Sequence, residues 1–309
     1  MIVKCFLREK HFFIYGQLSQ NVHKLKCFCY TNQYIFIGVF MSNKLFVLGP
    51  PDPEMEEIER VVRACGHQVA YASLMNKRVR SNEAYFATGV LGQIDLKSEL
   101  IFVECNVLGL SADYKMDHHS PGDPGYLCGP EQYFEGSSIG QVLNFLEVEP
   151  TEEQRIIAAA DHCPTQAYLG LCPGIDPEKL RVWRTMTRAK RRKMSFSEME
   201  HAILVGKSIL EKAQKIEYCG TEFSWLDSRD NEVQEASARF NIPFMYKELV
   251  PESIKFDETK PVVDKSLVKM GIMGAAPETI SAWMTESRDV LDRVYGAPLR
   301  GYAGGYVEL

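Results

Sequence analysis

The chain has 309 residues and a mass of 35.1 kDa, which exceeds one average domain and predicts two packed domains. Its 45% apolar and 25% charged residues are typical of a globular protein and exclude a disordered, collagen-like or coiled-coil chain. The net charge of -6 and the isoelectric point near 5.7 argue against a dedicated binder of duplex DNA.

No run of residues approaches the roughly 20 apolar positions of a membrane-spanning helix. The first ten residues lack the apolar core and small-residue cleavage site of a secretory signal. Nine cysteines, an odd number without a repeating spacing, favour reduced thiols over a disulfide framework. We therefore expect a cytoplasmic protein that does not bind membranes.

Residues 1–40 differ in composition from the rest. They are rich in aromatic residues and Cys, and contain a single Glu and no Asp. From Met41 the sequence is typical of a chain start, followed by a buried strand, a turn and an amphipathic helix. Two interpretations of residues 1–40 stay open: a translated upstream stretch that is not native, or a short strand-rich extension.

Residues 41–165 alternate between strand-like and helical patterns. The short apolar runs at 45–49, 67–72 and 100–105 are predicted strands. Between the first two, Ile58, Val61 and Val62 recur at helical spacing. This alternation predicts an α/β domain with a largely parallel sheet, in which ligands bind beyond the carboxyl ends of the strands.

Helical patterns follow at 137–148 and at 151–163, the second beginning at Thr151. A long helical pattern at 178–215 belongs to a predicted connector over residues 166–215. Beyond it, the sequence predicts strands at 216–226, 242–249 and 266–274, and a helix at 277–296 that begins at Pro277. We therefore expect a smaller C-terminal α/β domain over residues 216–309.

Acidic residues and histidines stand where the predicted sheet would bring them together. Asp52 and Glu54 follow the first strand, Glu104 ends the strand at 100–105, and the triplet 117–119 precedes a loop. Clustered carboxylates raise one another's pKa unless a cation neutralises them. Carboxylates with one or two imidazoles suit a divalent ion such as Mn²⁺ or Mg²⁺.

The pair Asp161-His162, on the helical pattern at 151–163, belongs to the same set, and three residues of the set have structural alternatives. Asp52 is also a typical helix cap, Glu104 could be a surface residue at a strand end, and His162 is also typical of a hydrogen-bonded packing residue. The basic helix at 181–193 could hold phosphates through Arg188 or be a solvated surface. The glycines of the C-terminal tail could bring backbone amides to a phosphate or form a flexible end.

The triplet DHH at 117–119 resembles the signature of the DHH phosphoesterase superfamily, which includes single-strand exonucleases, oligoribonuclease-type phosphodiesterases and family II inorganic pyrophosphatases. The segment PPDPEM at 50–55 is similar to the first motif of that family, and FVECN at 102–106 to the second. The runs at 135–146 and 156–163 resemble two later helices of the family. The likeness covers residues 45–163 and rests on the order of the motifs.

The sequence departs from the family's pattern at three places. Leu48 occupies the position of the first-motif His, and Glu54 and Glu104 stand where the family usually has Asp. The tail at 300–309 has glycines but lacks the His of the family's glycine-rich loop. A metal ligand is therefore missing, and a two-metal site could be shifted or reduced to one metal.

The resemblance implies a metal-dependent hydrolase of a phosphoester or phosphoanhydride, of the nucleotide or short-oligonucleotide class. The implied cofactor is a divalent metal, Mn²⁺ ahead of Mg²⁺. The expected metal ligands are Asp52, Glu104, Asp117, His118 and Asp161, and the expected catalytic residues are His119 and Glu54. The expected substrate-binding residues are His162, Arg188, Arg300, Gly304 and Gly305, and the C-terminal domain over residues 216–309 is the expected substrate-binding domain.

The expected partner is a small phosphorylated molecule or a short single-stranded nucleic acid, and a homodimer is compatible with the sequence. Two alternatives stay open. One is a nucleotide- or phosphate-binding protein without turnover, and the other is a metal hydrolase that cleaves an amide or ester through the Asp-His pairs at 117–118 and 161–162. Metal dependence separates the first alternative from the phosphoesterase, and substrate class separates the second.

Overall fold

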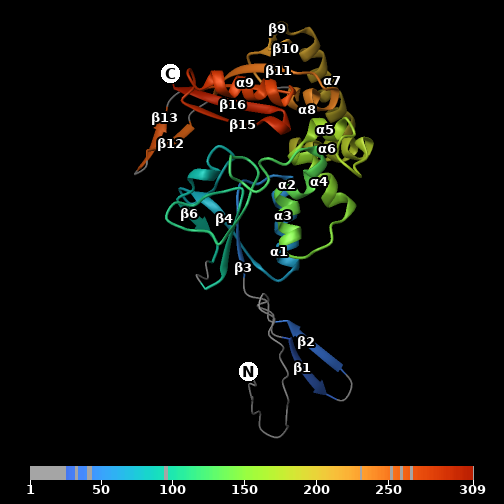
Figure 1. Cartoon of the computed structure of the whole chain (residues 1–309), viewed down its shortest axis with the longest axis vertical. Helices are drawn as coiled ribbons and strands as arrows, with labels where there is room; N and C mark the ends of the chain where they lie inside the picture. Colours follow the sequence, from blue (N-terminus) through green and yellow to red (C-terminus); the bar gives the residue numbers. More distant parts are fainter. Residues whose placement is uncertain are drawn as a thin grey trace.

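The protein is a mixed α/β chain with two six-stranded sheets, which lie one above the other in Figure 1. The computed structural model describes residues 26–31, 34–39, 44–93, 97–229, 232–250, 253–257, 260–264 and 267–308. Most of residues 1–40 lie outside this set, so the question of their origin stays open. Within them, β1 (Lys26–Thr31) and β2 (Tyr34–Val39) pair antiparallel.

The N-terminal sheet has the strand order β5-β4-β3-β7-β8. Its strands are β3 (Lys44–Leu48), β4 (Gln68–Leu74), β5 (Lys77–Arg78), β7 (Glu99–Val103) and β8 (Tyr114–Met116). Neighbours from β4 through β3 and β7 to β8 are parallel, whereas β5 and β6 (Gly89–Leu91) pair antiparallel with β4. The three strands predicted in this region are confirmed, and the carboxyl ends of β3, β7 and β8 meet at one edge.

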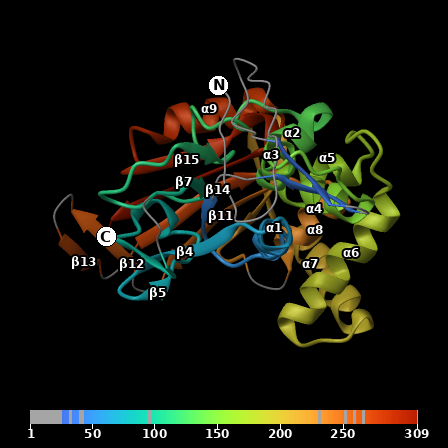
Figure 2. The same cartoon turned by 90° about the horizontal axis from the view of Figure 1, so that it is seen from below.

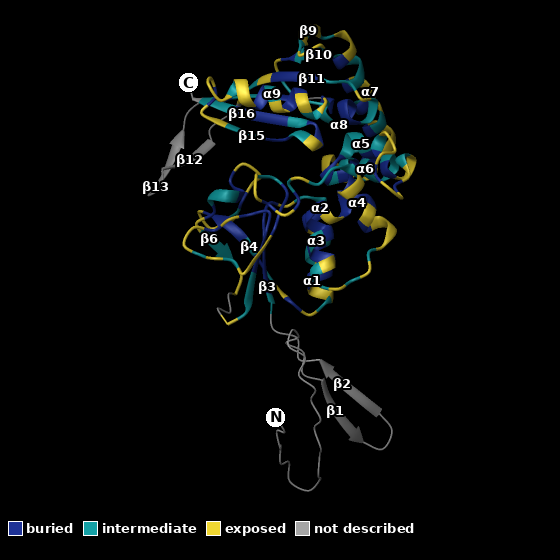
Figure 3. Ribbon diagram, viewed as in Figure 1, coloured by how far each residue is buried: buried dark blue, intermediate teal, exposed yellow. Residues whose placement is uncertain are grey.

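Three helices pack on one face of this sheet: α1 (Pro53–Ala64), α3 (Ser138–Phe145) and α4 (Glu152–His162). Phe46 and Leu48 face these helices, whereas Leu45 and Val47 face a second cluster, as the two-residue period of a strand requires. Figure 3 shows the buried strands and the inner sides of the helices in dark blue. Each fully buried large apolar side chain stabilises the fold by about 1.5–3 kcal/mol.

Gly49, directly after β3, lets two strands come close at the edge where the acidic residues lie. A Cβ atom at this position would lie 2.4 Å from the backbone oxygen of Glu104. We expect Gly49→Ala to lower the free energy of unfolding by about 1–2 kcal/mol, because the backbone around Glu104 must move. Urea unfolding measures the loss. Gly129→Ala is the control, since a Cβ there meets nothing within 4 Å; an equal loss in both variants would contradict the steric explanation.

The prediction of one continuous helix at 178–215 is wrong. The chain instead forms α6 (Pro177–Arg192) and α7 (Phe196–Lys212), which lie at one side of the molecule in Figure 2. Lys193 ends α6 in the left-handed conformation, with φ of 55°. Ser195 then begins α7 through a reciprocal capping box with Glu198. The remaining helices before the C-terminal sheet are α2 (Tyr133–Gly136) and α5 (Pro164–Tyr168), with the 3-10 turns η1 (Ala84–Phe86) and η2 (Pro130–Gln132).

The C-terminal sheet has the order β15-β16-β14-β11-β10-β9. Its strands are β9 (Gln214–Tyr218), β10 (Thr221–Leu226), β11 (Phe244–Val250), β14 (Leu267–Met273), β15 (Arg293–Ala297) and β16 (Tyr302–Glu308). Only β10 and β11 pair parallel among these strands. A separate pair is β12 (Ser253–Asp257) with β13 (Lys260–Asp264).

The helices of the C-terminal region are α8 (Val233–Phe240), α9 (Pro277–Ser287) and the 3-10 turn η3 (Pro298–Arg300). The predicted helix at 277–296 does begin at Pro277, but it ends at Ser287 and the chain enters β15 at Arg293. The Tyr126 hydroxyl donates to the Gly296 carbonyl at 2.9 Å, and Arg293 lies over the Phe86 ring. These contacts hold the C-terminal sheet against the N-terminal half. No described helix has the length and apolar character to span a bilayer.

Candidate metal centre

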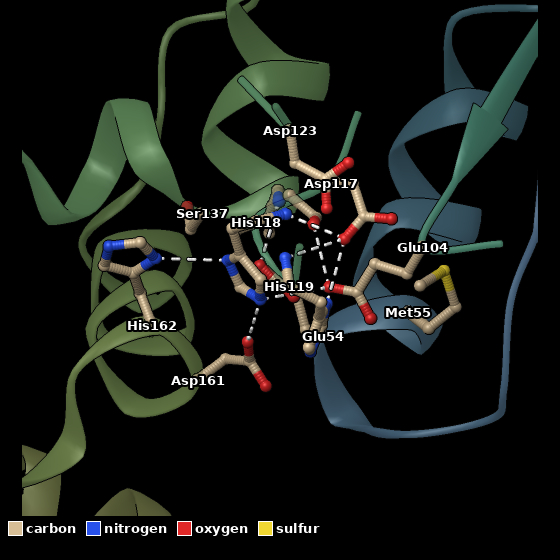
Figure 4. A network of polar contacts seen from close by, with 12 residues as sticks. Glu54, Met55, Glu104, Asp117, His118, His119, Asp123, Ser137, Asp161 and His162 are labelled. Atoms are coloured by element: carbon tan, nitrogen blue, oxygen red, sulfur yellow. Dashed lines mark hydrogen bonds and ion pairs between the residues drawn. The ribbon is translucent and has the colours of Figure 1, made fainter. Parts of the chain in front are cut away.

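Four side chains of the N-terminal half converge at the carboxyl edge of the parallel sheet. Glu54 lies in the first turn of α1, Glu104 directly follows β7, His118 follows β8 by one residue, and Asp161 lies in the last turn of α4. One ligand atom from each lies within 4.8 Å of the others, and the cluster could hold a metal ion. Figure 4 shows His118 at the centre, with Asp161 and His162 reaching it from α4.

Three polar atoms in this cluster are buried without a hydrogen bond. They are Glu54 Oε2, His118 Nε2 and Asp161 Oδ2. His118 Nε2 lies 3.2 Å from Asp161 Oδ2 and 3.5 Å from Glu104 Oε1. Buried polar atoms nearly always find a partner, because leaving one without costs about 1–3 kcal/mol. A cation placed among these atoms would satisfy all of them.

A chain of contacts fixes which nitrogen of His118 carries the proton. His162 Nε2 lies 2.9 Å from the Cys128 carbonyl, to which it must donate, so His162 Nδ1 accepts from His118 Nδ1 at 3.1 Å. Burial and the charge of Arg300 lower the pKa of His118 to about 3 and that of His162 to about 4, so both rings are neutral. We therefore assign a lone pair to His118 Nε2, directed at the carboxylates, which is the form that binds metals.

Without a cation, burial and mutual repulsion disfavour the charged form of the carboxylates in the cluster. Burial and the charge of Asp161 raise the pKa of Glu54 well above its usual value, and burial raises that of Glu104 to about 8. Burial also opposes ionisation of Asp161, but the charge of Arg300 helps to hold its pKa below the usual value. Such gathered carboxylates are typical of sites that a divalent cation neutralises.

The backbone around Glu104 and Glu54 aims both side chains inward. Glu104 has φ of 49°, in the left-handed region that costs a non-glycine residue about 1–3 kcal/mol. Its Oε1 accepts from Ser138 Oγ at 2.8 Å, while Glu54 Oε1 accepts from the Ile139 amide at 2.9 Å. The start of α3 therefore orients both carboxylates. Glu54, expected as a catalytic residue, lies among the candidate ligands.

Asp117, expected as a metal ligand, belongs to neither ligand group found among the described residues. Its carboxylate accepts the amides of His118 at 2.7 Å and His119 at 3.1 Å, the His119 ring at 2.9 Å and the Tyr85 hydroxyl. Lys115 Nζ lies 3.6 Å away. These donors occupy both oxygens and lower the pKa of Asp117 to about 2, although burial opposes its ionisation. Asp117 therefore positions the two histidines.

His119 lies beside the cluster, with its side chain about one third exposed (35%). It forms a second candidate group with Glu104 and His118. Burial opposes protonation of the ring, but the charge of Glu104 and the contact with Asp117 outweigh it and raise the pKa of His119. His119 therefore offers a proton donor at the open side of the cluster.

Asp52, also expected as a metal ligand, caps a helix. Its Oδ1 accepts the Met55 amide at 2.8 Å at the N-terminus of α1, so the alternative interpretation is confirmed. Asp52 is absent from both ligand groups in the described part of the chain. Burial and the charge of Asp161 raise its pKa to about 6. The side chain therefore lies near the cluster and adds negative charge to it.

His162, expected to bind substrate, is completely buried, and both of its ring nitrogens have partners. The packing interpretation is therefore confirmed. Gly136 leaves room for this ring, since a Cβ there would lie 2.7 Å from His162 Cε1. His162 acts on the site by setting the tautomer of His118.

Arg300 makes contacts that the sequence did not predict. Its buried guanidinium donates to three backbone carbonyls, those of His162 at 2.6 Å, His118 at 3.1 Å and Asp161 at 3.4 Å. These bonds form a clamp that joins the C-terminal sheet to the loop and helix of the candidate centre. Arg300 also lines the cleft, so its expected contact with substrate stays a prediction.

We expect Arg300→Lys to weaken Mn²⁺ binding about tenfold, because an ammonium group cannot span the three carbonyls that hold His118 and Asp161 in place. Calorimetric titration of the chelated protein measures the change. Arg288→Lys is the control, since Arg288 is exposed. Unchanged affinity in the Arg300 variant would contradict the role of the clamp.

Arg188 on α6 pairs with Glu232 and Glu235. It also lines the cleft, so its expected contact with phosphate stays a prediction. Gly304 and Gly305 do not form a loop, since both lie within β16 between β14 and β15. Their amides face neighbouring strands, and the reason for these glycines is steric.

The centre lies at a cleft of about 1920 Å³ between the two halves. The cleft lining includes Asp52, Glu54, Glu104, His119 and Asp161 on one side, and Arg229, Lys269, Tyr295 and Tyr306 on the other. The sequence analysis did not identify two residues that contact Asp117. Tyr85 lies in η1, away from the motifs, and Gln141, which contacts the Asp117 amide and carbonyl, lies in α3 within the motif-like run at 135–146.

Comparison with known proteins gives no relative for this chain: no protein-family model, curated protein or solved structure matches it. The resemblance of its motifs to the DHH superfamily therefore stays a prediction.

Proposed function

We propose that the protein is a divalent-metal-dependent hydrolase of a phosphoester or phosphoanhydride. One observation carries the proposal: Glu54 Oε2, His118 Nε2 and Asp161 Oδ2 are buried side by side without hydrogen-bond partners, at the edge of a cleft. Three carboxylates with one imidazole favour Mn²⁺, with Mg²⁺ second. The motif resemblance supports the same reading.

A bound divalent cation would lower the pKa of a water molecule and neutralise charge on phosphoryl oxygens. The chain's own residues supply the rest. His119, with its raised pKa, would donate a proton or a hydrogen bond to the phosphoryl group from the open side. Asp117 holds the His119 ring at 2.9 Å, and Arg300 holds the backbone of the ligands.

The proposed substrate is a small phosphorylated molecule or a short single-stranded nucleic acid. The cleft of about 1920 Å³ has room for more than one phosphoryl unit, and cations line the side that faces the carboxylates. An arrangement of a negative pocket for the metal opposite positive side chains suits an anionic substrate that bridges the two.

The test uses the full chain freed of metal with a chelator and then supplied with Mn²⁺. We expect nitrophenol release from bis(p-nitrophenyl) phosphate with Mn²⁺, and none with chelator. His119→Gln is expected to lower kcat at least about 100-fold while the Mn²⁺ affinity stays within about threefold. Turnover that survives chelation, or turnover of p-nitrophenyl acetate alone, would contradict the proposal. Binding of phosphate without any turnover would favour the binding-protein alternative.

A further inference from the structure

The face of the C-terminal sheet that borders the cleft carries two rows of residues in register. Cross-strand partners lie on the same face, and residues two apart on one strand share that face. The first row is Tyr246, Gly271, Gly304 and Tyr295. The second row is Glu248, Lys269, Tyr306 and Arg293. The two rows place aromatic rings and charges around a central pair of glycines.

The two glycines provide the space that the tyrosine rings of the first row occupy. A Cβ at Gly271 would lie 2.6 Å from the ring of Tyr246, and a Cβ at Gly304 would lie 2.5 Å from the Tyr295 hydroxyl. This is the steric reason for glycine at both positions, since neither φ lies in the left-handed region. The tyrosines therefore lie in the hollow that the glycines leave.

Lys269 and Arg229 lie close to the tyrosine rings of this face and to the carboxylate of Glu248. Lys269 Nζ lies 5.7 Å from the Tyr295 ring centroid and 5.6 Å from that of Tyr306. Arg229 lies 4.6 Å from the Tyr246 centroid, and its Nε donates to Glu248 at 2.7 Å. Within the part of the chain that the structure describes, no carboxylate forms an ion pair with Lys269.

The environment of Lys269 is unfavourable for its charge. Burial and the charge of Arg229 lower the pKa of Lys269 to about 8, with Glu248 opposing the shift only in part. Tyrosine rings attract an ammonium group, but a half-buried cation that forms no ion pair gains more from an anion. Lys269 also lines the cleft, so an anion in solution can reach it.

We propose that Lys269 and Arg229, on the tyrosine-lined face of the C-terminal sheet, form a subsite for an oxyanion, a phosphate or a carboxylate group. The subsite would hold a second anionic group of the substrate, away from the group that reaches the metal centre. That role in substrate binding rests on the proposed function. Binding of a free anion does not, because the metal centre lies on the other side of the cleft.

The test is calorimetric titration of the full chain with inorganic phosphate, and separately with acetate, in the presence of a chelator. We expect saturable binding of at least one of these anions that weakens with added salt. Lys269→Met is expected to weaken it at least about tenfold, because it removes a charged donor. Lys269→Arg keeps the charge, so its affinity for the anion is expected to stay within about threefold of the wild-type value.

Lys212→Met is the matched control, because Lys212 is exposed on α7 and lies outside the cleft. Its affinity for the anion is expected to equal that of the wild-type chain. Binding of neither anion, or equal affinity in the wild-type and Lys269→Met chains, would overturn the inference. These results are separable from those of the hydrolysis assay, because every anion titration is done with the metal removed.

Discussion

Asp161→Asn is expected to weaken Mn²⁺ binding at least about 100-fold. The substitution removes a negative charge and a ligand oxygen from the cluster. It also places an amide donor opposite the His118 Nε2 lone pair, which lies 3.2 Å from Asp161 Oδ2, so a second ligand atom becomes occupied. Changes in groups that only orient a ligand already cost about 10–100-fold in metal affinity.

Calorimetric titration of the chelated protein with Mn²⁺ at pH 8 measures this effect. Asp289→Asn is the matched control, because Asp289 is exposed and its substitution changes the net charge by the same amount. We expect the control to bind Mn²⁺ as the wild type does. If Asp161→Asn bound Mn²⁺ with unchanged affinity, Asp161 would not be a ligand.

The stability of the metal-free protein is expected to rise by about 2 kcal/mol as the pH falls from 8 to 6.5. Burial raises the pKa of Glu104 to about 8 in the folded state, whereas its unfolded value is near 4.5. In this window the folded state binds a proton that the unfolded state does not, so stability is lost as the pH rises. One pKa unit corresponds to about 1.4 kcal/mol, and Glu54 acts in the same direction.

Mn²⁺ is expected to reverse this pH dependence, because the ligands must be deprotonated to bind it. Below pH 6.5 the metal-free protein gains less stability as the pH falls. Burial lowers the pKa of His118 to about 3 and that of His162 to about 4 in the folded state, so in this range only the unfolded state protonates these two rings. Urea unfolding at a series of pH values, with chelator and with Mn²⁺, measures both slopes. Glu104→Gln is expected to flatten the metal-free slope. Identical slopes with and without metal would contradict the explanation.

The sequence predicted which strand ends carry the site, because parallel strands bring their carboxyl ends to one edge. Glu104 directly follows β7 and His118 is the second residue after β8, so the order of these parallel strands brings the two side chains near each other. The residues at the start of α1 were harder to assign. Asp52 and Glu54 are two positions apart, yet one caps the helix and the other is buried in the cluster. Which of the two side chains turns towards the cluster depends on the packing of α3. The local sequence pattern does not contain that information.

Other differences have the same physical origin. Asp117 and His118 are adjacent, yet the Asp117 carboxylate accepts hydrogen bonds from the loop amides and from Tyr85, while the His118 imidazole faces the cluster. The position of Tyr85 follows from the fold and not from the local sequence. By its sequence context, Gly304 resembles a loop glycine. The residue that requires glycine there is Tyr295, which lies on a neighbouring strand, so the local sequence does not show the reason. Arg300 carries a charge typical of substrate contacts, and its carbonyl partners lie in the loop after β8 and at the end of α4, which only the fold brings near.

The most direct test is a crystal of the protein soaked with Mn²⁺, measured for anomalous scattering. We predict one strong peak at coordination distance from Glu54 Oε2, His118 Nε2 and Asp161 Oδ2, with Glu104 beside it. A map with no peak among these atoms, or with Mn²⁺ bound only elsewhere, would contradict the assignment of a metal centre.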